Sequence, residues 1–137
     1  MKKFDAFSKR LEVLLRAEKN NLRDEFYRAG VIGHFNLTFE MAWKATKETL
    51  QLYGVDVAKT GSPREILKAA YQINFLHDEK IWLDMLKNRN TVAHVYDENA
   101  AVALSEKIFV NYIPALKNLR DLLEEKNSAV EKSGDVF

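Results

Sequence analysis

The sequence predicts an all-α protein, an antiparallel up-and-down bundle of four or five helices, and three observations support this fold class. Apolar residues recur at spacings of three and four through most of the chain, which is the period of an amphipathic helix. No stretch of useful length alternates in the manner of a β-strand. Short connections with helix-capping residues separate the apolar stretches, as in antiparallel bundles. With 137 residues, the chain has the size of one domain.

The first two helices are predicted by apolar stripes. The stripe of the first helix consists of Phe4, Phe7, Leu11 and Leu14. The stripe of the second, which begins after Asn20 and Asn21, consists of Ile32, Phe35, Phe39, Ala42, Trp43, Thr46, Leu50 and Tyr53. Gly54 then predicts a left-handed C-cap. The second pattern is long for a globular helix, and Gly30 and Gly33 can bend or interrupt it.

The next two helices are predicted by their N-caps. Residues 54–62 form the clearest loop of the chain. Ser62 and Glu65 have the spacing of a capping box around Pro63, which suits the first helical position. The apolar positions of this third helix are Ile66, Leu67, Ala70 and Ile73. Asp78 can cap a fourth helix. Its expected buried face consists of Ile81, Trp82, Met85 and Leu86.

A fifth helix is predicted to begin at Asp97 or Asn99. Its apolar positions are Val102, Phe109, Leu116, Leu119 and Leu123. Pro114 lies inside this helix and should kink it, because proline lacks a backbone donor and crowds the preceding turn. From Lys126 onward the periodicity is lost. We therefore expect one bundle domain over residues 1–125 and a frayed tail over residues 126–137.

Composition restricts the classes of function. Hydrophobic residues make up 47% and charged residues 30%, which is typical of a globular protein. Basic residues number 21 and acidic residues 20, and this near neutrality argues against broad nonspecific binding of nucleic acid. The absence of cysteine excludes disulfides and thiolate metal sites. Neither a signal peptide nor an apolar membrane span is visible, so we expect a cytoplasmic protein, and we expect no cofactor.

Side chains that can carry chemistry are concentrated in the run from Arg89 to Tyr96, after the fourth helix. Arg89 can bind a phosphate, His94 can transfer a proton, Tyr96 offers a hydroxyl and Asn90 an amide. On a regular helix Asn90 and His94 would share a face, whereas Arg89 and His94 would lie about 140° apart. Either the helix ends near Ala93 and His94 turns back, or a second copy of the chain completes the site.

Two interpretations of this run remain open. In the first, it cleaves an RNA phosphodiester without a metal, which requires a base at the 2′-hydroxyl and an acid at the leaving oxygen. A two-fold dimer would supply two copies of His94 for these roles, and Arg89 would stabilise the phosphoryl charge. In the second interpretation the residues are structural. Arg89 then pairs with an acidic neighbour such as Asp97, His94 caps a helix C-terminus, and Tyr96 packs its ring.

A second group of candidate residues lies in the long second helix. Phe39 and Trp43 are four residues apart and are expected in the core. Glu40 and Lys44 would then form an ion pair on the solvent side, although Glu40 can also reach the site. Either residue can instead belong to a partner surface.

The remaining candidates are basic residues and histidines. Lys80 and Lys87 can add to a basic rim beside Arg89, although scattered lysines are usually just solvated. His34 and His77 lack the spacing of metal ligands, so no metal site is expected.

Arg89, His94 and Tyr96 match the R-x4-H-x-Y signature of HepT-like toxins in the HEPN superfamily, and Asn90 directly after the arginine also fits. The chain is similar to one branch of that superfamily, the nucleotidyltransferase substrate-binding proteins. The matching pieces are Phe39-Glu40-Met41-Ala42-Trp43-Lys44, Ser62-Pro63-Arg64-Glu65 and Trp82-Leu83-Asp84-Met85-Leu86. The resemblance implies an all-α HEPN-like bundle that forms a homodimer or a higher homo-oligomer.

The resemblance also implies a function. Members are similar in acting with a small, minimal nucleotidyltransferase, and in toxin–antitoxin pairs the HEPN subunit is a metal-independent endoribonuclease. Carried over, Arg89 and His94 become the nuclease residues, Asn90 an auxiliary polar group, and Tyr96 the acceptor of AMP that silences the nuclease. The alternative is a noncatalytic subunit that binds a nucleotide or another substrate for its partner. The two hypotheses differ in whether His94 is needed for RNA cleavage.

Overall fold

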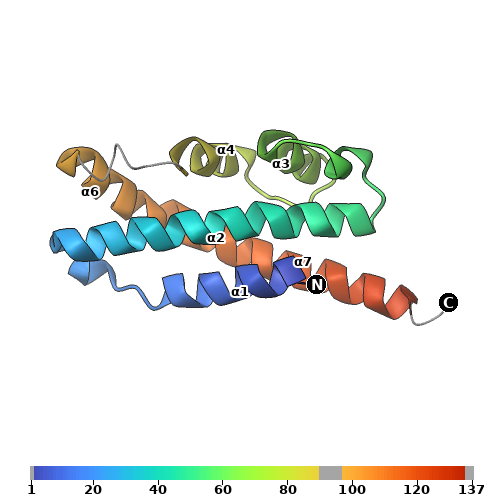
Figure 1. Cartoon of the computed structure of the whole chain (residues 1–137), viewed down its shortest axis with the longest axis horizontal. Coiled ribbons are helices and arrows are strands. Elements are labelled where there is room, and N and C mark those ends of the chain that lie inside the picture. Colours follow the sequence, from blue (N-terminus) through green and yellow to red (C-terminus); the bar gives the residue numbers. More distant parts are fainter. Residues whose placement is uncertain (1, 90–96, 135–137) are drawn as a thin grey trace.

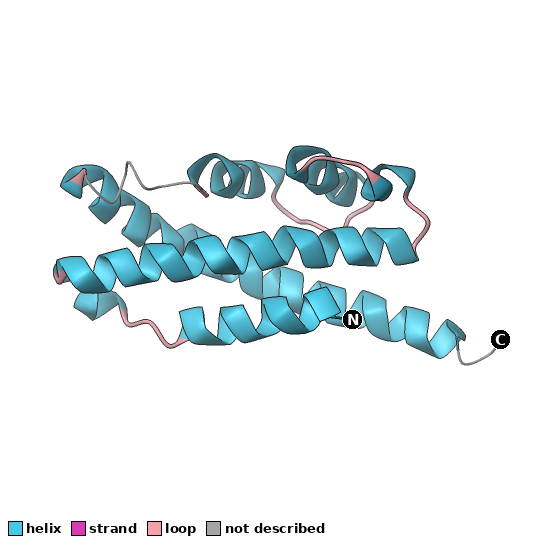
Figure 2. Ribbon diagram, in the orientation of Figure 1, coloured by secondary structure: helices cyan, strands magenta, loops and turns pink. Residues whose placement is uncertain are grey.

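The computed structural model describes residues 2–89 and 97–134, and every regular element within those ranges is helical (Figure 2). The elements are α1 (Lys2–Leu15), η1 (Lys19–Arg23), α2 (Glu25–Leu52), η2 (Asp56–Lys59), α3 (Pro63–Gln72), α4 (Glu79–Asn88), α6 (Glu98–Lys107), η3 (Ile108–Tyr112) and α7 (Ile113–Gly134). The predicted all-α class is confirmed for this part of the chain. None of these helices combines the length and the apolar character needed to cross a membrane.

Helix α2 is the spine of the bundle. It contacts α1, α3, α6 and α7. Figure 1 shows α1 along one side of α2 and the short helices α3 and α4 along the other, while α7 crosses α2. Helix α4 packs against α3 and η3, which places its end near the α6–α7 segment. The motif predicted from the sequence begins at this end.

The core forms where the apolar stripes of the helices face one another. Its largest fully buried side chains include Phe7, Phe35, Phe39, Trp82 and Tyr112. The rings of Phe39 in α2 and Trp82 in α4 lie 6.2 Å apart, centroid to centroid. Full burial of a large apolar side chain stabilises the fold by roughly 1.5–3 kcal/mol, so this contact anchors α4 on α2. Ile73, assigned to the stripe of the third helix, instead follows the end of α3 and is 40% exposed.

The predicted helix starts are confirmed by their caps. Ser62 and Glu65 form both hydrogen bonds of the capping box, each 3.2 Å long. Asp78 and Asp97 each accept a backbone N–H from the first turn of α4 and α6, also at 3.2 Å. Of the two residues proposed to begin the fifth helix, Asp97 rather than Asn99 is therefore the cap.

Helix α2 runs without interruption from Glu25 to Leu52. Gly30 and Gly33, which can bend or interrupt a helix, are exposed within this continuous one. A glycine in a helix costs only about 1 kcal/mol relative to alanine, and the packed apolar stripe of α2 outweighs this. The predicted end is confirmed, because Gly54 adopts a left-handed φ of 73°.

Pro114 lies directly after a π-turn. In η3 the N–H of Ile113 bonds to the carbonyl of Ile108, five residues earlier. Pro114 has no N–H for the usual bond to the residue four positions back, and the wider turn accommodates that missing bond. The helix then continues as α7, so the disturbance predicted at Pro114 has the form of a π-turn between two helices.

Helix α7 continues past residue 125 to Gly134, although the apolar periodicity fades near Lys126. Asn127 is buried, and its Oδ1 accepts a hydrogen bond of 3.0 Å from the Thr49 hydroxyl. The carbonyl of Lys126 accepts a hydrogen bond of 2.9 Å from the Tyr53 hydroxyl. These polar contacts hold the stretch against the C-terminal end of α2. Hydrophobic periodicity does not reveal contacts of this kind.

Candidate active site at the end of helix α4

The described part of the site begins where α4 ends. Asn88 is the last residue of this helix, and Arg89 follows as its C-cap with φ −63° and ψ −28°. The other three residues of the predicted motif, Asn90, His94 and Tyr96, lie outside the described residues. Of the motif, the structure therefore places Arg89.

Arg89 is paired with Glu40 of α2. Its Nη1 lies 3.6 Å from Glu40 Oε1, and the two side chains are 29% and 38% exposed. Glu40 thus lies next to Arg89, which agrees with one of the three interpretations given for it, that it reaches the site. The acidic neighbour suggested from the sequence, Asp97, instead caps α6. A partly exposed ion pair at this distance contributes about 0–1 kcal/mol, so Arg89 can exchange Glu40 for another anion at little cost.

Glu40 also contacts Trp43, and Lys44 contacts Trp43 rather than Glu40. The Trp43 indole Nε1 donates a hydrogen bond of 3.1 Å to Glu40 Oε2. Lys44 Nζ lies 5.9 Å from the centroid of the Trp43 ring, a cation–π contact. The ion pair of Glu40 is therefore with Arg89, and the expected Glu40–Lys44 pair does not form. Phe39 is fully buried and Trp43 partly buried, in agreement with their assignment to the core.

Behind Arg89 lies a hydrogen-bonded network that the sequence did not reveal. The Tyr112 hydroxyl donates to Asp84 Oδ2 at 2.5 Å and accepts from Asn88 Nδ2 at 2.9 Å. Lys107 Nζ lies 3.0 Å from the same oxygen of Asp84. Asp84 and Asn88 are four residues apart in α4, a spacing that indicates a shared face. Nothing in the sequence pairs that face with Tyr112.

The network keeps fixed protonation states around neutral pH. Burial raises the pKa of Asp84, but the hydrogen bonds from Tyr112 and Lys107 outweigh it and hold the pKa below the ordinary value of 3.8. Burial and the hydrogen bond to Asp84 raise the pKa of the Tyr112 phenol far above its ordinary value of 10.0. At neutral pH Asp84 is therefore an ionised acceptor and Tyr112 a protonated donor.

The charges around the end of α4 are mixed. Lys87 is exposed one turn from Asp84, and its charge contributes to lowering the pKa of that carboxyl. Within residues 2–89 and 97–134, no cluster of three or more histidine, aspartate or glutamate side chains is arranged to hold a metal ion.

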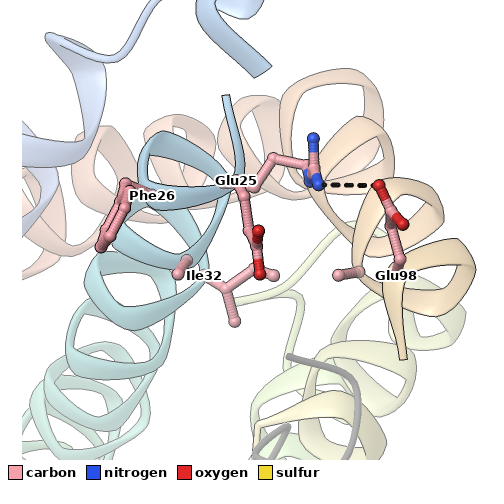
Figure 3. Close-up of a pocket in the computed structure, with 7 residues that line it drawn as sticks. Glu25, Phe26, Ile32 and Glu98 are labelled. Atoms are coloured by element: carbon pink, nitrogen blue, oxygen red, sulfur yellow. Dashed lines mark ion pairs between the residues drawn. The ribbon is translucent and has the colours of Figure 1, made fainter. Parts of the chain in front are cut away.

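A separate cavity of about 350 Å³ lies between the N-terminal ends of α2 and α6 (Figure 3). It is lined by Glu25, Phe26, Arg28, Ala29, Ile32, Glu98 and Ala101. Arg28 is buried, and its Nη2 lies 3.6 Å from Glu98 Oε1. The lining holds two carboxylates, Glu25 and Glu98, and one guanidinium, so the cavity does not favour a phosphate. It contains none of the described residues predicted for the site.

Comparison with known proteins gives two findings. The profile of the family described as "nucleotidyltransferase substrate binding protein like" matches residues 1–125 of this chain. The chain is also similar to a protein of Haemophilus influenzae named "probable ribonuclease HepT", with 28% identity over 82 residues. This second match covers 58% of the present chain and 56% of the Haemophilus protein, so it spans little more than half of that relative.

Proposed function

Because the chain belongs to the family of nucleotidyltransferase substrate-binding-like proteins, we propose that it is the helical partner subunit of a small nucleotidyltransferase and acts as a metal-independent endoribonuclease. The observation that carries the proposal is Arg89, a partly exposed guanidinium at the end of α4 in a loose ion pair with Glu40. A bidentate arginine at such a place can stabilise the charge that builds on a phosphate during cleavage. The name of the Haemophilus relative supports the same reaction.

The proposed cleavage needs a base and an acid besides Arg89. In the first step a neutral His94 takes the proton of the RNA 2′-hydroxyl, the 2′-oxygen bonds to phosphorus, and the bond to the 5′-oxygen breaks. A second, protonated His94 gives its proton to the leaving 5′-oxygen. Because one chain has a single motif, two copies of the chain form the site, and Asn90 assists as a hydrogen-bonding group.

Glu40 regulates access to Arg89 in this proposal. An arginine–carboxylate hydrogen bond of good geometry is about 2.7–2.9 Å long, whereas the Arg89–Glu40 separation is 3.6 Å. An RNA phosphate that approaches within the shorter range replaces Glu40 as the partner of the guanidinium. Glu40 keeps the hydrogen bond from Trp43 when this happens.

The proposed function is tested by RNA cleavage in the presence of EDTA. We expect the unmodified protein to cleave single-stranded RNA, and Arg89→Ala and His94→Ala each to lose about 100-fold or more in rate. Arg120→Ala is the matched control, because Arg120 forms a 2.7 Å ion pair with Glu12 that involves neither Arg89 nor Glu40. Retained cleavage in His94→Ala would refute the proposed role of His94 in the cleavage reaction. No cleavage by the unmodified chain, its mass first confirmed free of AMP, would favour the noncatalytic binding subunit.

The nucleotidyltransferase partner silences the nuclease, as in a toxin–antitoxin pair, by transferring AMP to the Tyr96 hydroxyl. The hydroxyl oxygen bonds to the α-phosphorus of ATP, and pyrophosphate leaves. The added phosphate places negative charge beside His94 and Arg89 and repels the RNA backbone. Incubation with the partner and ATP should add one or more AMP increments to the intact mass of the chain and stop cleavage. A mass increment that persists in Tyr96→Phe would refute this assignment.

A further inference from the structure

We infer that the Tyr112 hydroxyl is a positioning group that fixes the last turn of α4 and thereby the orientation of Arg89. Tyr112 belongs to η3, 24 positions after Asn88 and outside the motif, and the sequence gives it no role at the site. The consequence for RNA cleavage rests on the proposed function. The consequence for the conformation of α4 does not.

The position of the Tyr112 hydroxyl is set by the core. The side chain is fully buried, and its ring stacks on Phe35 of α2 with centroids 5.0 Å apart and an angle of 25° between the planes. A ring held in this way has no room to change rotamer without opening the core. The hydroxyl therefore projects from a rigid platform toward α4.

Tyr112 contacts α4 at two side chains of its last two turns. Its hydroxyl donates to Asp84 at 2.5 Å and accepts from Asn88 at 2.9 Å, and Asn88 directly precedes Arg89. Asp84 is an ionised acceptor, and hydrogen bonds to charged groups are the stronger ones. The three groups therefore tie the end of α4 to the spine of the bundle.

The π-turn makes this arrangement possible. In a regular α-helix Lys107 and Tyr112, five residues apart, would point about 140° away from each other. In a π-turn the hydrogen bonds join residues five apart, so these two positions face the same way. Lys107 and Tyr112 accordingly both reach Oδ2 of Asp84, at 3.0 Å and 2.5 Å. The π-turn before Pro114 thus places two side chains, Lys107 and Tyr112, against the same carboxylate of α4.

Two groups position Arg89: the hydrogen-bonded network around Tyr112 and the carboxylate of Glu40. Helix α4 has ten residues, and the last turn of so short a helix frays easily unless tertiary contacts hold it. The network fixes the backbone that leads into Arg89, and Glu40 on α2 guides the guanidinium. A shift of about 1 Å in a catalytic group can cost about 100-fold in rate, so this support has consequences for chemistry.

Tyr112→Phe tests the inference, because it removes one hydroxyl and keeps the ring. Tyr53→Phe is the matched control, since it removes a tyrosine hydroxyl that donates at 2.9 Å to the Lys126 carbonyl, outside the network. The first readout is hydrogen exchange at the backbone amides of Asn88 and Arg89, measured relative to amides of α1. The second is single-turnover RNA cleavage at saturating protein, together with the protein concentration at half saturation.

We expect Tyr112→Phe to speed exchange at Asn88 and Arg89 relative to α1, and Tyr53→Phe to leave it unchanged. The cleavage rate at saturating protein should fall about 10- to 100-fold in Tyr112→Phe but not in Tyr53→Phe. The protein concentration at half saturation should change by no more than about twofold in either variant. Unchanged local exchange would overturn the inference whatever the activity. Faster exchange with an unchanged cleavage rate would overturn the claim that Tyr112 orients Arg89 for cleavage. If the unmodified protein does not cleave RNA, the proposed function fails and exchange alone decides the role of Tyr112.

Discussion

At the scale of single residues, the contact between Arg89 and Glu40 decides what the site can bind. A guanidinium in a strong buried pair would be unavailable to a phosphate, whereas a free one at this position would attract any anion. The observed pair lies between these cases, at 3.6 Å and with both side chains partly exposed. In the proposed function, Glu40 therefore selects against weakly bound anions and leaves Arg89 available to an RNA phosphate.

Glu40→Gln should lower the RNA concentration at half saturation by roughly two- to tenfold. The amide keeps the size of the side chain but removes the negative charge that competes with phosphate for Arg89. Glu12→Gln is a matched control, because it releases Arg120 from an ion pair of 2.7 Å elsewhere in the bundle. Fluorescence anisotropy with a labelled RNA measures both variants. Equal or weaker RNA binding by Glu40→Gln would contradict the competing role of this carboxylate.

At the scale of elements, local signals predicted much of the fold. The Ser62 capping box, the Asp78 cap and the left-handed Gly54 were predicted because each depends on residues within a few positions along the chain. The π-turn before Pro114 and the extension of α7 through Asn127 were not. Apolar periodicity does not specify the form of the turn before Pro114, and the extension of α7 depends on a contact between distant segments, the hydrogen bond between Thr49 and Asn127.

The candidate site shows the same division. Arg89 was predicted from its motif, and reaching the site was one of the interpretations given for Glu40, which pairs with Arg89 in the structure. The network that joins Asp84 and Asn88 to Tyr112 was not predicted, because a tyrosine within an apolar stripe looks like any other core residue. Its polar role follows from the π-turn, and no periodicity in the sequence encodes that turn.

The exposed glycines of α2 give a prediction about stability. Gly30→Ala should raise the free energy of unfolding by about 0.5–1 kcal/mol, because a Cβ there meets nothing within 4 Å and alanine favours the helix. Gly61→Ala is the opposing control, because its Cβ would lie 2.5 Å from the Val57 carbonyl oxygen. Chemical denaturation measures both variants. A loss of stability in Gly30→Ala would mean that something covers this face of α2 in solution.

At the scale of the whole molecule, the bundle acts as a rigid support for a small site. The core anchors α4 through Trp82 and Phe39, and the π-turn fixes its last turn. A net charge of +1 gives the chain little general attraction for nucleic acid, so the proposed binding of RNA depends on local charges such as Arg89. One motif supplies one histidine, and the proposed nuclease needs two proton-transfer groups. The proposed ribonuclease site therefore requires two copies of the chain, each of which supplies one His94.

The most direct test of this claim is a subunit-exchange experiment. A fixed amount of unmodified chain is mixed with increasing amounts of His94→Ala, and RNA cleavage is measured in EDTA. If the site requires His94 from both copies, mixed dimers are inactive. Cleavage per unmodified chain should then fall toward zero as the variant reaches large excess. Cleavage that stays constant per unmodified chain, or its absence in unmodified protein confirmed free of AMP, would contradict a ribonuclease site shared between two chains.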